Sequence, residues 1–238
     1  MRKVRADLHL HTCLSPCADT QMKATAIVEQ ARKVGLDMIG ICDHNSAENV
    51  AALVKAGARE GLTVIPGMEV TSSEEVHILG LFDTETDLML LQDMVYENLP
   101  GENSEEAFGP QYVIDEWDRI IGTNSKLLIG ATLLTVEQIV DAIHERAGLA
   151  IAPHVDRERF SLIGQLGFIP KGLKLDALEV STPCAATKEY DYPVICSSDA
   201  HFLKDIGKNS SCFMVEEASV HEIGKALRQE LGRRVVSN

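Results

Sequence analysis

Six of the eight histidines in this 238-residue chain lie at the ends of segments that we predict to be strands. Each of the six is close in sequence to a carboxylate or to another histidine. Imidazole and carboxylate are the ligands that zinc, manganese and iron take in catalytic sites. Side chains from several strand ends can meet only if those ends share one rim of a barrel or sheet. The pattern therefore predicts a centre of several metal ions, built from His9, His11, His44, His77, His154 and His201.

Apolar runs alternate with helical segments along the chain, which is typical of βα units around a parallel sheet. We predict strands at residues 4–10, 38–42, 63–66, 76–82, 149–152, 177–180, 194–197 and 211–215. Helices are predicted at residues 24–34, 48–60, 86–98, 136–147 and 220–231, with a short turn around 158–166. Gly35, Gly61 and Gly148 follow helical segments and are expected to be left-handed C-caps. The alternation indicates an α/β barrel.

The length and composition fit one domain over residues 1–238, because 45% hydrophobic residues suffice for the core of a single α/β barrel. No segment approaches the roughly 20 uninterrupted apolar residues that a membrane span needs. The first four residues lead straight into a predicted strand, so we expect no signal peptide and a cytoplasmic location. The sequence does not indicate an oligomeric state.

The formal net charge of −14 repels phosphate backbones at long range. No extended basic track is visible, so we do not expect the chain to bind long nucleic acids. A small phosphorylated substrate is favoured, and short oligonucleotides stay open as an alternative.

Residues 100–132 interrupt the βα pattern and are interpreted as an insertion. Residues 101–109 are acidic and small, and residues 112–121 are typical of a β-hairpin. Two interpretations remain open: a flap over the rim, or an inert excursion on the surface.

The six cysteines, including Cys184, show neither zinc-ribbon spacing nor a compact disulfide framework. Cys13 and Cys17 flank the loop after the first histidine pair and could face the metals. A structural or incidental role is the preferred interpretation, since this spacing carries little specificity.

His9 and His11 are two residues apart in a predicted strand, so their side chains point the same way and can hold one metal. Asp43-His44, Glu69 and Asp199-x-His201 strengthen this prediction. Without ligands or partners, each buried polar group would cost about 1 to 3 kcal/mol.

Four segments together resemble the PHP family (polymerase and histidinol phosphatase domain), metal-dependent phosphoesterases with a distorted (β/α)7 barrel. They are Asp7-Leu8-His9-Leu10-His11-Thr12, Asp43-His44-Asn45, Pro66-Gly67-Met68-Glu69-Val70 and Ser198-Asp199-Ala200-His201. Residues 14–19 and 152–157 look like a stand-alone bacterial branch of that family.

The resemblance implies two or three divalent ions of zinc, manganese or iron. The first would be held by His9, His11, Glu69 and Asp199. Glu69 would bridge to a second ion, completed by His77 and His154. His44 and His201 would hold a third ion together with a residue of the loop after the first motif, for which we choose Asp19. Asp7 and Asp43 are expected to orient the neighbouring imidazoles.

The expected reaction is hydrolysis of a phosphate ester by a metal-bound hydroxide. The sequence contains neither a Gly-x-Ser-x-Gly nucleophile elbow nor a P-loop, the motifs that would indicate a different chemistry. The residues expected to act in catalysis are Glu69, Asp199, His201 and Arg157. Arg157 is preferred over Arg159 as the group that binds phosphate, because it follows His154 more closely.

The expected substrate is a small phosphomonoester, such as a nucleotide or sugar phosphate. A nuclease or oligonucleotide phosphodiesterase is an alternative with the same chemistry. A catalytically silent domain that binds metal or nucleotide for regulation is an alternative of another class. The nearly complete ligand set argues against it.

Overall fold

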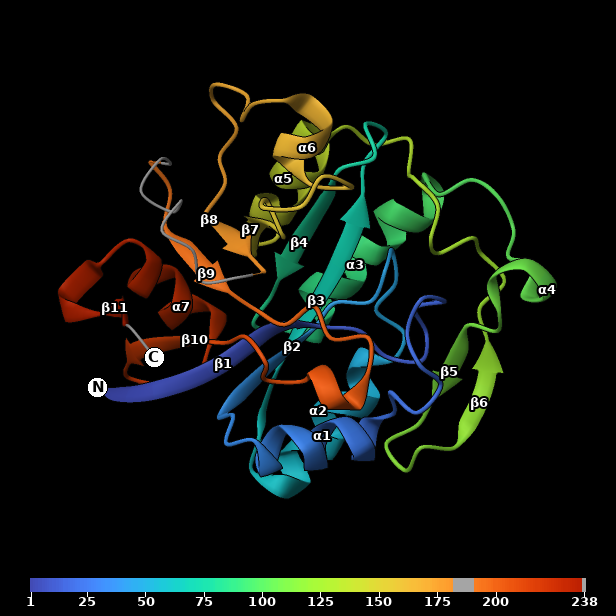
Figure 1. Ribbon diagram of the computed structural model, residues 1–238, viewed down its shortest axis with the longest axis horizontal. Coiled ribbons are helices and arrows are strands. Elements are labelled where there is room, and N and C mark those ends of the chain that lie inside the picture. Colours follow the sequence, from blue (N-terminus) through green and yellow to red (C-terminus); the bar gives the residue numbers. More distant parts are fainter. Residues whose placement is uncertain (182–190, 237–238) are drawn as a thin grey trace.

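A computed structural model describes residues 1–181 and 191–236. Its main sheet has nine strands in the order β11-β10-β1-β2-β3-β4-β7-β8-β9. Seven of them form the body of the fold (Figure 1): β1 (Arg2–Leu10), β2 (Met38–Ile41), β3 (Thr63–Thr71), β4 (His77–Leu81), β7 (Leu149–Ala152), β8 (Ala177–Val180) and β9 (Val194–Cys196). The other two, β10 (Ser211–Val215) and β11 (Arg234–Val236), continue the sheet beyond β1.

The chain after β9 returns to the end of β1 and nearly closes the sheet. Leu10 and Ala200 form a parallel bridge, in which the backbone N–H of His11 donates to the carbonyl of Ala200 at 3.0 Å. The bridge links the end of β1 to the segment that follows β9, and so brings the two outer members of the seven-strand set together. The expected α/β fold with a distorted seven-stranded barrel is therefore confirmed.

Strand β4 runs against its neighbours, whereas the sequence predicted parallel strands. Its register with β3 pairs Thr71 with His77 and Gly67 with Leu81. β3 is also longer than predicted and continues to Thr71, so only residues 72–76 connect the two strands. A link this short cannot hold the crossover that parallel strands require. As a consequence, the first residue of β4 lies at the rim where the parallel strands end.

Apart from α4, which was not predicted, the α-helices lie close to the predicted positions. They are α1 (Ala24–Lys33), α2 (Val50–Glu60), α3 (Glu85–Glu97), α4 (Glu105–Phe108), α5 (Val136–Glu145), α6 (Leu162–Leu166) and α7 (Val220–Leu227), with 3-10 turns at Leu203–Asp205 and Glu230–Gly232. In Figure 1, α1 and α2 lie at the bottom of the view, and α7 lies beside β10 and β11 at the left. Each long helix buries an apolar face against the sheet, as Ile27, Leu53 and Ile139 illustrate. The last strand, β11, was not predicted.

Two of the three expected glycine caps form, and the third does not. Gly35 and Gly61 have φ values of 76° and 66°, in the left-handed region. After α5, however, Ala147 takes that conformation with φ 55°. Gly148 is required for packing instead, because a Cβ atom there would lie 2.5 Å from Cε1 of Phe82.

The predicted hairpin forms a separate two-stranded sheet of β5 (Tyr112–Ile114) and β6 (Ile120–Thr123). It is tied to the loop after β1, since the N–H of Tyr112 donates to the carbonyl of Cys13 at 3.1 Å. Further along, the side-chain amide of Asn45 donates to the carbonyls of Leu128 and Gly130, both at 2.8 Å. Residues 100–132 are therefore fastened to the loops at the rim.

Within residues 1–181 and 191–236, none of the helices combines the length and the hydrophobicity that crossing a bilayer requires. Cys184 lies outside the described residues.

Candidate metal centre

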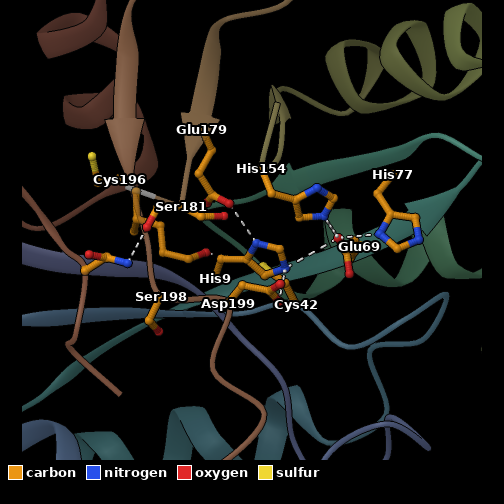
Figure 2. A network of polar contacts seen from close by, with 12 residues as sticks. His9, Cys42, Glu69, His77, His154, Glu179, Ser181, Cys196, Ser198 and Asp199 are labelled. Atoms are coloured by element: carbon orange, nitrogen blue, oxygen red, sulfur yellow. Dashed lines mark hydrogen bonds and ion pairs between the residues drawn. The ribbon is translucent and has the colours of Figure 1, made fainter. Parts of the chain in front are cut away.

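The six imidazoles singled out in the sequence lie together at one rim. His9 and His11 come from the end of β1, His44 follows β2, and His77 begins β4. His154 follows β7 and His201 follows β9. Neighbouring ring centroids are 4.2 to 6.3 Å apart, and all six rings are buried except that of His201, which is partly exposed. Figure 2 shows His9, His77 and His154 arranged around the carboxylate of Glu69.

Glu69 is the centre of the cluster and is only 1% exposed. Its Oε1 lies 2.8 Å from Nδ1 of His77 and 3.2 Å from Nε2 of His154. Its Oε2 lies 3.0 Å from Nδ1 of His44 and 3.4 Å from Nε2 of His11. Oε1 is also 3.5 Å from Nε2 of His9. A carboxylate that faces five imidazoles through both oxygens is suited to bridging two cations.

Asp199 is the second carboxylate of the cluster. Its Oδ1 lies 3.0 Å from Nε2 of His11, 3.4 Å from Nε2 of His9 and 3.6 Å from Nδ1 of His201. Asp199 has φ 50° and His154 has φ 35°, in the left-handed region that non-glycine residues rarely adopt. Strained backbone of this kind gathers at functional sites, where the surrounding structure holds it in place.

The ring nitrogens of His9 and His11 that face away from the cluster both have partners. Nδ1 of His9 lies 3.0 Å from Oε1 of Glu179 in β8, and Nδ1 of His11 lies 3.1 Å from the hydroxyl of Ser15. With Nδ1 engaged in this way, each ring directs its Nε2 into the cluster, where the two Nε2 atoms are 3.2 Å apart. His9 and His11 therefore present two ligand atoms to one point.

Glu179 was missed in the sequence, although it is the only charged residue in the strand Ala177–Val180. It is 1% exposed. A lone acid inside a short apolar strand was the signal that could have identified it, because such a group is buried only beside a partner.

Asp7 and Asp43 accept hydrogen bonds from backbone and hydroxyl groups, and among the described residues neither is hydrogen-bonded to an imidazole ring. Asp7 accepts hydrogen bonds from the N–H groups of Ser198 and Gly207, both at 2.9 Å. Asp43 accepts from the N–H and hydroxyl of Thr12 at 2.7 Å and from the hydroxyl of Ser15 at 2.6 Å. Asp43 is thus linked to the ring of His11 through the hydroxyl of Ser15, and Asp7 holds the backbone of Ser198 next to Asp199. That both residues orient imidazoles stays a prediction.

The loop side chain next to the imidazole ring of His201 is that of Cys17, whereas the side chain of Asp19 had been expected there. The Sγ of Cys17 lies 3.1 Å from Nε2 of His201. Oδ1 of Asp19 accepts a hydrogen bond from the N–H of Gln21 at 2.8 Å and caps its own turn. The groups of described residues with converging ligand atoms include His11, His44 and His201, but not Asp19.

Several buried polar atoms of the cluster lack a hydrogen-bond partner: Nδ1 of His44, Oε2 of Glu69, Nδ1 of His154 and Oε2 of Glu179. The first two lie 3.0 Å apart without hydrogen-bonding geometry. An unsatisfied buried polar atom costs about 1 to 3 kcal/mol. A cation between Nδ1 of His44 and Oε2 of Glu69 would satisfy both of those atoms, so the side chains present fit a metal centre.

The carboxylates and imidazoles of the cluster shift one another's pKa values. Burial by itself would raise the pKa of Glu69, but the imidazoles of His77, His9 and His44 hold that pKa well below its usual range. Burial and the nearby His201 hold the pKa of His11 well below its ordinary value. Glu69 is therefore ionised and His11 neutral near pH 7, which are the states that bind metal. Although burial lowers the pKa of an imidazole, the carboxylates around His9 hold its pKa well above the ordinary value, and Glu69 does the same for His44. Binding of cations would therefore displace protons from these two rings.

A cavity of about 240 Å³ opens onto the cluster. Arg157 and Arg159 line it together with Phe160 and Ile129. Nη1 of Arg157 donates to Oδ2 of Asp199 at 2.5 Å, and its Nε donates to the hydroxyl of Ser181 at 2.9 Å. The ring of Phe160 stacks on His77 with centroids 4.9 Å apart. Ile129 belongs to residues 100–132, so that segment contributes to the wall of the cavity.

The chain resembles several characterised proteins. It is 23% identical to a 5'-3' exoribonuclease of Haemophilus influenzae, over 85% of this chain and 93% of that protein. It is 32% identical over 80 residues to a phosphoribosyl 1,2-cyclic phosphate 1,2-diphosphodiesterase of Eggerthella lenta, which is 32% of this chain and 29% of that protein.

The lesion-specific endonuclease PfuEndoQ from Pyrococcus furiosus has a similar fold, with a TM-score of 0.74 and 21% identity. The match covers 98% of this chain but 58% of that chain. This chain thus spans less than two thirds of the Eggerthella and Pyrococcus proteins. The model of the PHP domain matches residues 7–157, which include both His9 and His154. The chain therefore belongs to the PHP domain family.

Proposed function

We propose that this chain is a metal-dependent hydrolase of phosphate ester bonds. The observation that carries the proposal is the position of Glu69, whose two oxygens face five imidazoles at the floor of an open cavity. Asp199 and His201 also line this cavity. Membership of the PHP domain family supports the same class of reaction.

The proposed centre takes two or three divalent ions of zinc, manganese or iron. His9, His11, Glu69 and Asp199 would hold the first, and Glu69, His77 and His154 the second. His44 and His201 would contribute to a third. When bound, such ions bind phosphoryl oxygens, lower the pKa of water and stabilise the leaving oxygen.

The residues around the ions would position the substrate. Arg157 lines the cavity, and its guanidinium pairs with Asp199. A phosphate group offers the same arrangement of oxygens as a carboxylate, so Arg157 can exchange one partner for the other. Arg159 lines the same cavity and adds a second positive charge. Phe160 and Ile129 give the cavity an apolar side for the remainder of the substrate.

The favoured substrate is a small phosphomonoester, such as a nucleotide or sugar phosphate. A cavity of about 240 Å³ suits a small group, and a net charge of −14 disfavours a long polyanion.

The second candidate is a nuclease or phosphodiesterase that acts on short oligonucleotides. The Haemophilus relative is named as an exoribonuclease, and a structure of endonuclease Q contains a 27-mer duplex with an abasic lesion. A silent regulatory domain has less support, because the imidazoles and both carboxylates are all present at the rim. We also propose that residues 1–238 act as one domain, with residues 100–132 as an insertion.

The test is a hydrolysis screen with protein loaded with zinc, manganese or iron. The panel contains nucleoside monophosphates, sugar phosphates, a cyclic phosphodiester and 5'-phosphorylated oligoribonucleotides. His9→Ala should abolish turnover, while His221→Ala should retain it, because His221 is exposed and outside the cluster. Turnover that survives His9→Ala, or an inactive protein that carries its full complement of ions, would contradict the proposal.

A further inference from the structure

The thiol of Cys17 lies at the open side of the histidine cluster. Its Sγ is 3.1 Å from Nε2 of His201, and the thiol also lines the cavity above Glu69 and His44. Among the described residues, Cys13, Cys42 and Cys212 are buried and Cys196 is partly buried, whereas Cys17 is exposed.

A short turn fixes the position of this thiol. The N–H of Ala18 donates to the carbonyl of Ser15 at 3.0 Å, which closes a β-turn with Pro16 and Cys17 at its centre. Proline is favoured at the second residue of such a turn, because its ring fixes φ close to the value that the turn requires. The hydroxyl of Ser15 anchors one end to Asp43, and the N–H of Asp19 donates to the carbonyl of His201 at 2.9 Å at the other end. The loop therefore holds Cys17 against His201.

The neighbouring groups already have the arrangement of a cation site. Ligand atoms of His11, His44 and His201 lie within 4.8 Å of one another. His44 is 4% exposed, and its Nδ1 has no hydrogen-bond partner. His11 directs its Nε2 toward Asp199 and Glu69, so His44 and His201 need a further ligand from another segment.

We infer that Cys17 is the protein ligand that completes the third metal site with His44 and His201. This inference rests on the proposed metal centre. Two imidazoles and one thiolate are a recurrent ligand set for zinc, and they leave a position open for water or substrate. A thiolate also makes the site softer than a carboxylate would, so this position favours zinc over manganese.

The decisive measurement is the absorption spectrum of the full-length protein reconstituted with cobalt(II) in place of its native ions. A thiolate ligand should give an intense charge-transfer band in the near ultraviolet. Cys17→Ser should lose that band and bind about one ion fewer per chain. Cys17→Asp should also lose the band but keep the ion, because a carboxylate remains available as a ligand. Cys196→Ser is the matched control and should keep both the band and the ion.

A second measurement uses the unmodified sequence, so it does not depend on how a variant folds. Iodoacetamide should alkylate Cys17 in the metal-free protein, and zinc should slow that reaction at least about tenfold, because a coordinated thiolate is a weaker nucleophile. Peptide mass spectrometry locates the modified residue.

Bound cobalt without the charge-transfer band, or equal alkylation with and without zinc, would overturn the assignment of Cys17 and leave the proposed hydrolase intact. A wild-type protein that binds no cobalt would overturn both.

Discussion

Oε1 of Glu179 lies 3.0 Å from Nδ1 of His9, and both side chains are buried. The two residues come from different ends of the chain, on β8 and β1. This contact fixes the ring of His9 so that its Nε2 faces Glu69 and Asp199. A carboxylate behind a metal-binding imidazole also increases the basicity of the ligand nitrogen.

Glu179→Gln should therefore weaken metal binding by about 10- to 100-fold, although Glu179 is not itself expected to bind the ion. Competition with a chelator of known affinity measures this loss. Glu217→Gln removes an exposed carboxylate and serves as the control, with unchanged affinity expected. Equal affinities for the two variants would show that Glu179 has no such role.

Arg157→Ala should raise the KM for a phosphate ester about tenfold, which corresponds to the loss of about 1.4 kcal/mol from a charge-assisted hydrogen bond. The effect is moderate because the Arg157 side chain is 43% exposed. Steady-state kinetics with the best substrate of the screen measures it. Arg159→Ala provides the comparison and should have the smaller effect, since Arg157 is the residue that pairs with Asp199. An unchanged KM in Arg157→Ala would refute the assignment of Arg157.

Gly148→Ala should lower the free energy of unfolding by about 1 to 3 kcal/mol, because the new methyl group would overlap Phe82 and Ile143 in a packed core. Urea denaturation followed by circular dichroism measures the change. Gly122→Ala is the control: no atom lies within 4 Å of the added Cβ, so a change below about 0.5 kcal/mol is expected. A stable Gly148→Ala variant would mean that the packing around Phe82 can adjust.

The buried pair of Glu222 and Arg233 should make the stability dependent on pH. Nε of Arg233 donates to Oε2 of Glu222 at 3.0 Å, and hydrogen bonds from Arg233 lower the pKa of Glu222 to about 2. Because the folded pKa is below the ordinary value of 4.5, the pair contributes fully above pH 4.5 and loses its contribution as the pH falls toward 2.

Glu222→Gln should thus cost about 2 kcal/mol of unfolding free energy at pH 7. The difference from wild type should shrink below pH 4.5, over the range in which both proteins fold. Urea denaturation at a series of pH values measures both quantities. A difference that stays constant from pH 7 to pH 3 would mean that Glu222 does not titrate in this way.

The sequence by itself indicated the barrel, the family and the six histidines that share its rim. These features could be predicted from the sequence because strand periodicity and strand-end position are local properties of the chain. Residues two apart in one strand must point the same way, so the strand pattern alone pairs His9 with His11. The hairpin in residues 112–121 could also be predicted from the sequence, because it pairs two strands that are close together in the chain.

Only the tertiary structure decided which groups support the histidines. Glu179 is distant from His9 along the chain, and their contact depends on how the sheet curls until β8 approaches β1. Cys17 and Asp19 belong to the same loop, and the turn through Pro16, rather than the residue types, determines which one faces His201. The antiparallel direction of β4 is seen only in its pairing with β3. The need for glycine at position 148 is seen only in the close approach of the Phe82 ring. Contacts between distant segments follow from the packing of the whole fold, which no local pattern contains.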